Sequence, residues 1–171
     1  PVMAAEISTK ARRSLGIGYI GLAHYLAKKG YSYEQKLGWR QVDKLTEAFQ
    51  FYLLKASNEL AKEKGQFPNF DWDGYSQSLF VQDLPKKLQT KIKNNGIRNC
   101  TLTTVAPTGS GAIVARVTSG VEPIFATSYQ RKVKKNDSLG KEFDTFTVYH
   151  PVVQEMFGTD ENLPEYVVTA H

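Results

Sequence analysis

Residues 99–112 read NCTLTTVAPTGSGA and join a β-type run of Thr, Leu and Val to a turn rich in Gly, Ser and Thr. Pro107 fixes the corner at the end of the run, and Gly109 and Gly111 allow backbone N–H groups to approach a ligand closely. A new apolar segment follows, and the free N–H groups at its start point to the same place. This order of strand, corner and helix start predicts a cradle for an anion such as phosphate.

The same residues are also compatible with an ordinary turn that binds nothing. Thr108 and Ser110 place two hydroxyl groups beside the free N–H groups, and the helix dipole favours negative charge there. These features favour the anion site. The turn lacks the lysine of a Walker A loop, so the sequence does not indicate nucleotide hydrolysis.

The composition is typical of a folded chain, and it predicts no direct contact with a membrane or with nucleic acid. Its 171 residues are 41% hydrophobic, and the net charge of +5 is spread along the chain. Apolar runs fall short of the about 20 residues that a membrane span needs, and a secretion signal is lacking. Cys100 is the single cysteine, which excludes an internal disulfide and a cysteine-based metal site. We therefore expect a cytoplasmic protein without a structural metal.

The spacing of apolar residues and the placement of Gly and Pro predict the order of the elements. Two helices, each followed by a glycine, precede an irregular stretch over residues 66–84. A short polar helix then leads into the strand that opens the anion loop. The predicted helices cover residues 8–29, 42–64, 86–93, 110–116 and 151–157, and the predicted strands cover residues 98–105, 124–133 and 142–149.

Residues 16–21 read GIGYIG and match the dinucleotide-binding pattern G-x-G-x-x-G. That pattern works after a buried strand, whereas the residues before Gly16 are polar and compatible with a helix. We therefore interpret these glycines as sites where a helix packs closely against a neighbour. Cys100 is interpreted as a small buried residue, and His24 and His150 as packing or capping residues rather than catalytic groups.

Four blocks of this chain, in the same order, resemble the catalytic subunit of ribonucleotide reductases, and together they span most of the sequence. They read RRSLGIG, YLLKASNELA, RNCTLTTVAPTG and SGVEP, at residues 12–18, 52–61, 98–109 and 119–123. The resemblance implies an α/β fold: a helix-rich partial barrel, part of a ten-stranded α/β barrel. Residues 1–171 would then form a single segment, the C-terminal half of that barrel and an incomplete domain.

The resemblance also implies a substrate and a site. The loop would bind the phosphates of a ribonucleoside diphosphate or triphosphate. The residues that the resemblance assigns to this pocket are Ala106, Pro107, Thr108, Gly109, Ser110 and Gly111, with Arg12, Arg13 and Glu122 in support. The expected partner is the remaining half of the barrel, or a second copy of the chain.

The chain departs from the family in its cysteines. The family carries a radical on one cysteine and reduces the ribose with a cysteine pair, whereas Cys100 matches neither position. We therefore assign no catalytic residue, and we expect the chain alone to be inactive and to bind no cofactor. The full enzyme, which supplies deoxyribonucleotides for DNA replication, would use adenosylcobalamin or a di-iron radical subunit. The Ala-Pro-Thr-Gly form of the loop and residues 146–151 favour the adenosylcobalamin class, whereas residues 14–63 are also close to the di-iron-dependent class. The alternative is a stand-alone nucleotide- or phosphate-binding module, or a structural interaction module, without catalysis.

Overall fold

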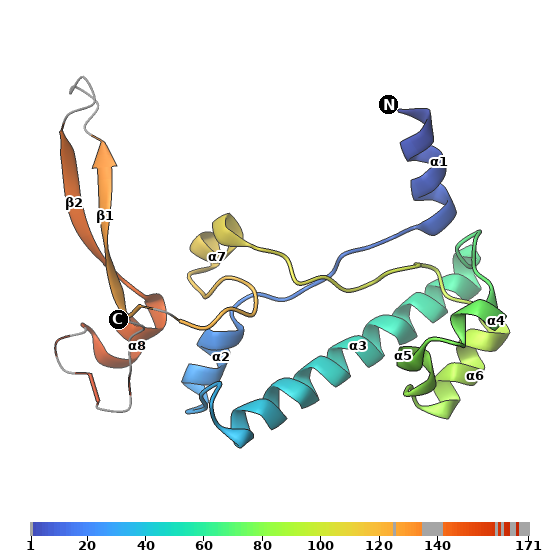
Figure 1. Cartoon of the computed structure of the whole chain (residues 1–171), viewed down its shortest axis with the longest axis horizontal. Coiled ribbons are helices and arrows are strands. Elements are labelled where there is room, and N and C mark those ends of the chain that lie inside the picture. Colours follow the sequence, from blue (N-terminus) through green and yellow to red (C-terminus); the bar gives the residue numbers. More distant parts are fainter. Residues whose placement is uncertain are drawn as a thin grey trace. The chain divides into compact units, whose positions relative to one another are not determined.

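The computed structural model describes residues 2–124, 126–134, 142–159, 161, 163–164 and 167. The chain divides into two compact units (Figure 1). The first unit comprises the residues up to Gly18 together with Trp39–Val105, and the second comprises Tyr19–Gly38 together with the residues from Ala106 onward.

The first unit is built around the long helix α3, Lys36–Lys64 (Figure 1). The predicted helix over residues 42–64 is confirmed, and it begins earlier, at Lys36. It ends where Gly65 adopts the left-handed conformation (φ +81°), which a glycine adopts without steric cost. The apolar stripe of α3 contributes Leu54 to the buried cluster of this unit. The other members of that cluster are Phe67, Leu88, Ile92 and Ile97.

Shorter helices pack the rest of this cluster. α6, Lys86–Asn95, follows Pro85 and ends at Gly96, which confirms the predicted polar helix. Residues 66–84, predicted to be irregular, contain two single-turn helices, α4 (Trp72–Tyr75) and α5 (Leu79–Gln82).

The predicted helix over residues 8–29 is wrong. Helix α1, Met3–Arg12, ends at Arg13, whose left-handed conformation (φ 49°) stops it. Helix α2, Leu22–Lys28, begins only after Gly21. The residues between them bond to a distant part of the chain, and three glycines in that stretch weaken any helix there. The apolar residues do recur at helical spacing, but hydrogen bonds to a distant part of the chain keep this segment extended.

The predicted strand over residues 98–105 is reduced to a single parallel bridge between Ile17 and Thr103. Further backbone bonds run on either side of the bridge: the Leu15 N–H donates to the Thr101 carbonyl (2.9 Å) and the Cys100 N–H to the Arg12 carbonyl (3.0 Å). The chain is therefore paired with residues 12–17 here, although it does not form a regular strand.

The second unit contains α2, helix α7 (Gly109–Ala115), strands β1 (Ser128–Lys134) and β2 (Phe143–Tyr149), and helix α8 (Pro151–Phe157). The strands form an antiparallel pair in which Ser128 faces Tyr149 and Lys134 faces Phe143. These elements confirm the two predicted helices and the predicted hairpin, with the first strand shorter than expected. The predicted connection over residues 135–141 lies outside the described residues.

The architecture agrees with a segment of a mixed α/β fold. Within the described residues there is one two-stranded sheet and no closed barrel. The expectation that residues 1–171 form one incomplete domain stays a prediction. Among the helices of the described ranges, none is both long and apolar enough to cross a membrane.

Candidate functional site

The predicted anion loop lies in the second unit and leads directly into α7. Thr108 is the residue before the helix, and its carbonyl accepts the first helical bond, from the Ala112 N–H (2.9 Å). Its Oγ1 accepts a hydrogen bond from the Gly120 N–H (3.1 Å). A side chain on Gly120 would place its Cβ 3.2 Å from the Ala106 carbonyl oxygen. The loop and the later Ser-Gly corner, which the sequence marks as separate motifs, therefore hold each other in place.

The start of α7 offers unused hydrogen-bond donors. Gly109, Ser110 and Gly111 are exposed, and within the described part of the chain their N–H groups donate no hydrogen bond. A Cβ built on Gly109 or Gly111 meets nothing within 4 Å, so there is open space beside both glycines. Several N–H groups left unused at a helix start suit the oxygens of an anion.

A cavity of about 630 Å³ lies beside the same helix and reaches the start of the hairpin. Gly109 of the loop and Glu122, a predicted supporting residue, both line it. Arg116, at the C-terminal end of α7, lines the cavity as well. Most of the remaining lining is apolar, with Ile113, Pro123, Ile124 and Tyr129 among the contributing residues.

The two predicted supporting arginines belong to the first unit. Arg13 carries the left-handed conformation that ends α1, and its carbonyl accepts a hydrogen bond from Asn99 Nδ2 (2.8 Å). Its Nε is buried without a partner among the described residues. Arg12 is exposed at the last position of the helix. Because the loop lies in the second unit, the supporting role of Arg12 and Arg13 stays a prediction.

Cys100 is exposed, so its interpretation as a buried packing residue is wrong. It lines a cavity of about 440 Å³ in the first unit together with Tyr75. Burial raises the pKa of the Tyr75 hydroxyl, and Cys100 raises it further. Within the described ranges no group of three or more His, Cys, Asp or Glu side chains could hold a metal ion.

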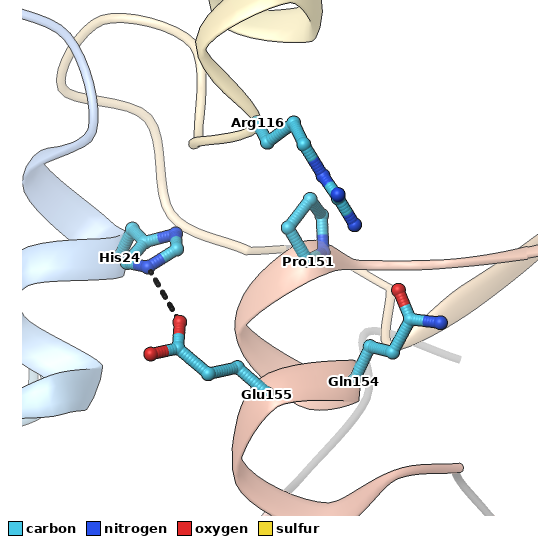
Figure 2. Close-up of a pocket in the computed structure, with 5 residues that line it drawn as sticks. All are labelled: His24, Arg116, Pro151, Gln154 and Glu155. Atoms are coloured by element: carbon cyan, nitrogen blue, oxygen red, sulfur yellow. Dashed lines mark ion pairs between the residues drawn. The ribbon is translucent and has the colours of Figure 1, made fainter.

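The interpretation of His150 as a capping residue is confirmed. Its Nδ1 accepts a hydrogen bond from the Val152 N–H (3.3 Å) at the start of α8. His24 is a buried residue of α2, and its Nε2 lies 3.6 Å from a carboxylate oxygen of Glu155 on α8 (Figure 2). Lys28 Nζ lies 2.6 Å from the other oxygen of that carboxylate. No local pattern in the sequence indicates this cluster, because Lys28 and Glu155 are 127 residues apart.

Comparison with known proteins identifies the family. The profile described as "Ribonucleotide reductase, barrel domain" matches residues 1–165. The chain is 38% identical over 139 residues to ribonucleoside-diphosphate reductase 1 subunit alpha of Escherichia coli, and this match covers 72% of the chain and 18% of the relative. It is 40% identical over 139 residues to the corresponding subunit alpha of a Buchnera aphidicola strain, with the same shares covered.

A relative of a different description matches as well. The vitamin B12-dependent ribonucleoside-diphosphate reductase of Mycobacterium tuberculosis is 33% identical over 126 residues, which covers 74% of the chain and 16% of the relative. The chain therefore spans less than a fifth of the length of these curated relatives. Because the family profile covers nearly the whole sequence, the chain belongs to the ribonucleotide reductase barrel-domain family.

Proposed function

We propose that this chain is a segment of a ribonucleotide reductase large subunit and that residues 106–111 bind the phosphates of the ribonucleotide substrate. The observation that carries the proposal is the row of exposed residues Gly109, Ser110 and Gly111 at the start of α7, whose N–H groups donate to nothing among the described residues. The family of the chain suggests which anion binds there, because the names of several relatives specify a ribonucleoside diphosphate.

The contacts around the loop support a preorganised site. The Gly120 N–H is bonded to Thr108, and the Ala106 carbonyl lies close to the same glycine. The loop is therefore fixed by its own neighbours before any ligand arrives, which lowers the entropy lost on binding. Glu122 follows the same corner and would act in support, with Arg12 and Arg13 of the first unit.

Reduction of the ribose needs more than this chain contains. Its sequence has one cysteine, Cys100, whereas the family chemistry uses a radical cysteine and a redox pair. We therefore infer that the chain supplies the substrate-phosphate site and that the remaining half of the barrel, or a second copy, completes the structure. The chain alone would be inactive.

The radical-generating cofactor is a separate part of the proposal. The form of the loop and residues 146–151 favour adenosylcobalamin, and the relative from Mycobacterium tuberculosis is named as vitamin B12-dependent. The other relatives carry no such word in their names.

Calorimetric titration of the chain with a ribonucleoside diphosphate tests the phosphate site. Gly109 has no special backbone conformation and open space around it, so Gly109→Val leaves the fold intact and places a branched side chain in front of the N–H groups. We expect this variant to lose binding. Val114→Ala is the matched control, because Val114 lies on the same helix, is 86% exposed and is outside the loop.

The outcomes separate the alternatives. Binding that survives Gly109→Val contradicts the assignment of the loop. Binding by the chain alone, without reduction after the missing half of the barrel is added, would favour the stand-alone binding module. If the chain does not bind the ribonucleoside diphosphate even when that half is present, a purely structural role is the remaining alternative.

A further inference from the structure

His150 caps helix α8 with an imidazole nitrogen, which is a cap that depends on protonation. The bond from the Val152 N–H to His150 Nδ1 (3.3 Å) needs a lone pair on that nitrogen. A protonated imidazole has N–H groups on both nitrogens and accepts nothing. The backbone of His150 is held independently, because its N–H donates to the Thr127 carbonyl (2.8 Å). Protonation therefore removes the cap while the residue stays at the corner.

Burial and the neighbouring ring of His24 oppose a positive charge on His150. The ring of His24, on α2, lies 6.3 Å away between centroids, and His150 itself stands at the positive end of the α8 dipole. Arg116 lines the cavity of about 370 Å³ that His24 shares with Pro151, the first residue of α8 (Figure 2). The carboxylate lining this cavity is that of Glu155, which pairs with Lys28 and faces His24. His150 itself lines the cavity of about 630 Å³, where the charged side chains are those of Arg116, Arg131 and Glu122.

Helices α2 and α8 also pack against each other, with Leu22, Ala23 and Leu26 buried on one and Val152 and Val153 buried on the other. The capped residue Val152 therefore belongs to the packed face of α8. Loss of the cap frees the first turn of the helix where it contributes to the contact between the two helices.

We propose that His150 is a pH-sensitive cap that secures the first turn of α8 against α2 while its imidazole is neutral and releases that turn when the imidazole is protonated. Burial, and then the neighbouring His24, lower the pKa of His150 from its ordinary value of 6.5. The unfolded chain therefore takes up this proton at a higher pH than the folded chain does. The contribution of the cap to stability is complete above 6.5 and is lost as the pH falls toward the lowered value.

Nuclear magnetic resonance on the full 171-residue chain tests the proposal. The ring protons of His150 and the amide of Val152 are followed between pH 8 and pH 5. We expect His150 to titrate below 6.5 and the Val152 amide to follow the same midpoint. Protection of that amide from hydrogen exchange, corrected for the intrinsic rate, should fall by about fivefold once His150 is protonated, the size typical of one cap.

His150→Asn keeps a neutral capping group that does not titrate, because Asn is among the preferred residues at this position. The variant should retain protection of Val152 at both ends of the pH range. A Val152 amide that titrates with an unchanged midpoint in His150→Asn overturns the proposal. A wild-type chain in which His150 titrates with no response at Val152 overturns it as well, and this measurement needs no variant.

Discussion

Replacement of Asn58 by alanine should destabilise the first unit more than any comparable change on the surface of α3. Asn58 is 1% exposed, and its side-chain Nδ2 donates to two carbonyls at the end of α6, those of Lys91 (3.0 Å) and Gly96 (2.7 Å). Asn58 therefore ties the C-terminal part of α6, and the residue that follows it, to the middle of α3.

The magnitude follows from what each carbonyl loses. The Gly96 carbonyl is left buried without this donor, which costs about 1–3 kcal/mol. The Lys91 carbonyl still accepts a bond from Asn95 Nδ2 (2.9 Å), so its loss is that of one ordinary hydrogen bond, about 0.5–1.5 kcal/mol. Together the change should lower the free energy of unfolding by about 2–4 kcal/mol.

Urea unfolding followed by circular dichroism at the helical band measures this difference. Asn95→Ala is the matched control, because it removes a bond to the same Lys91 carbonyl while leaving Asn58 in place. That control should remain within about 0.5 kcal/mol of the wild type, since alanine also favours the helix more than asparagine does. If Asn58→Ala costs no more than Asn95→Ala, the reasoning from the two carbonyls is refuted.

The binding test at Gly109 and the titration of His150 are joined by two further predictions. A Cβ on Gly18 would lie 2.5 Å from the Thr104 carbonyl oxygen, whereas one on Gly16 would lie 3.2 Å from a Thr104 methyl group. Gly18→Ala should therefore lower the free energy of unfolding by about 1–3 kcal/mol, and Gly16→Ala by less, in the same urea assay. Lys28→Met should raise the pKa of Glu155, because the Lys28 hydrogen bond is the largest cause that lowers it. The pKa of Glu155 is lower in the folded chain than its ordinary value of 4.5, so its contribution to the stability of the fold is present above that pH and is lost as the pH falls through the lowered value. In the variant, this loss of stability should occur at a higher pH. Carboxyl ¹³C shifts measure the change, and an unchanged midpoint in the variant would contradict it.

The elements that the sequence predicts well are those whose stabilising contacts are local or whose ends are marked. Helix α3 carries a long apolar stripe and ends at a glycine with positive φ, and α6 lies between Pro85 and Gly96. The predicted helix over residues 8–29 was wrong because the contacts that fix this segment are not local. The Leu15 and Ile17 N–H groups bond to carbonyls more than 80 residues away, at Thr101 and Leu102, and spacing within one segment carries no information about such partners.

The candidate site shows the same division. The turn and the helix after it follow from local residue types, and the structure begins that helix at Gly109, one residue before the predicted start at Ser110. The bond between Gly120 and Thr108 was not foreseeable, because the sequence shows two glycine-rich corners without showing that they meet. The cluster of His24, Lys28 and Glu155 was missed entirely, since its members are isolated in the sequence.

The glycines of the GIGYIG stretch show that a glycine pattern alone does not indicate whether the backbone approaches a ligand or another part of the chain. Gly18 and Gly21 do permit close approach, as predicted, but the neighbours are the Thr104 carbonyl and the Val117 side chain rather than a ligand. Gly21 also stands before α2, so an extended segment does lead into a helix here, contrary to the expected helical context. A phosphate at the start of α2 is disfavoured because the N–H groups there already donate hydrogen bonds within the chain.

The donors at the start of α2 are bound within the chain. The Gly21 and Leu22 N–H groups donate to the Thr118 and Gly120 carbonyls, and the His24 N–H donates to the Thr118 hydroxyl. The start of α7 has the same kind of backbone, yet its N–H groups donate to nothing among the described residues. Of two helix starts with equally suggestive glycines, only the one with unused donors has hydrogen bonds to offer an anion, and this difference lies in the partners of the backbone rather than in the motif.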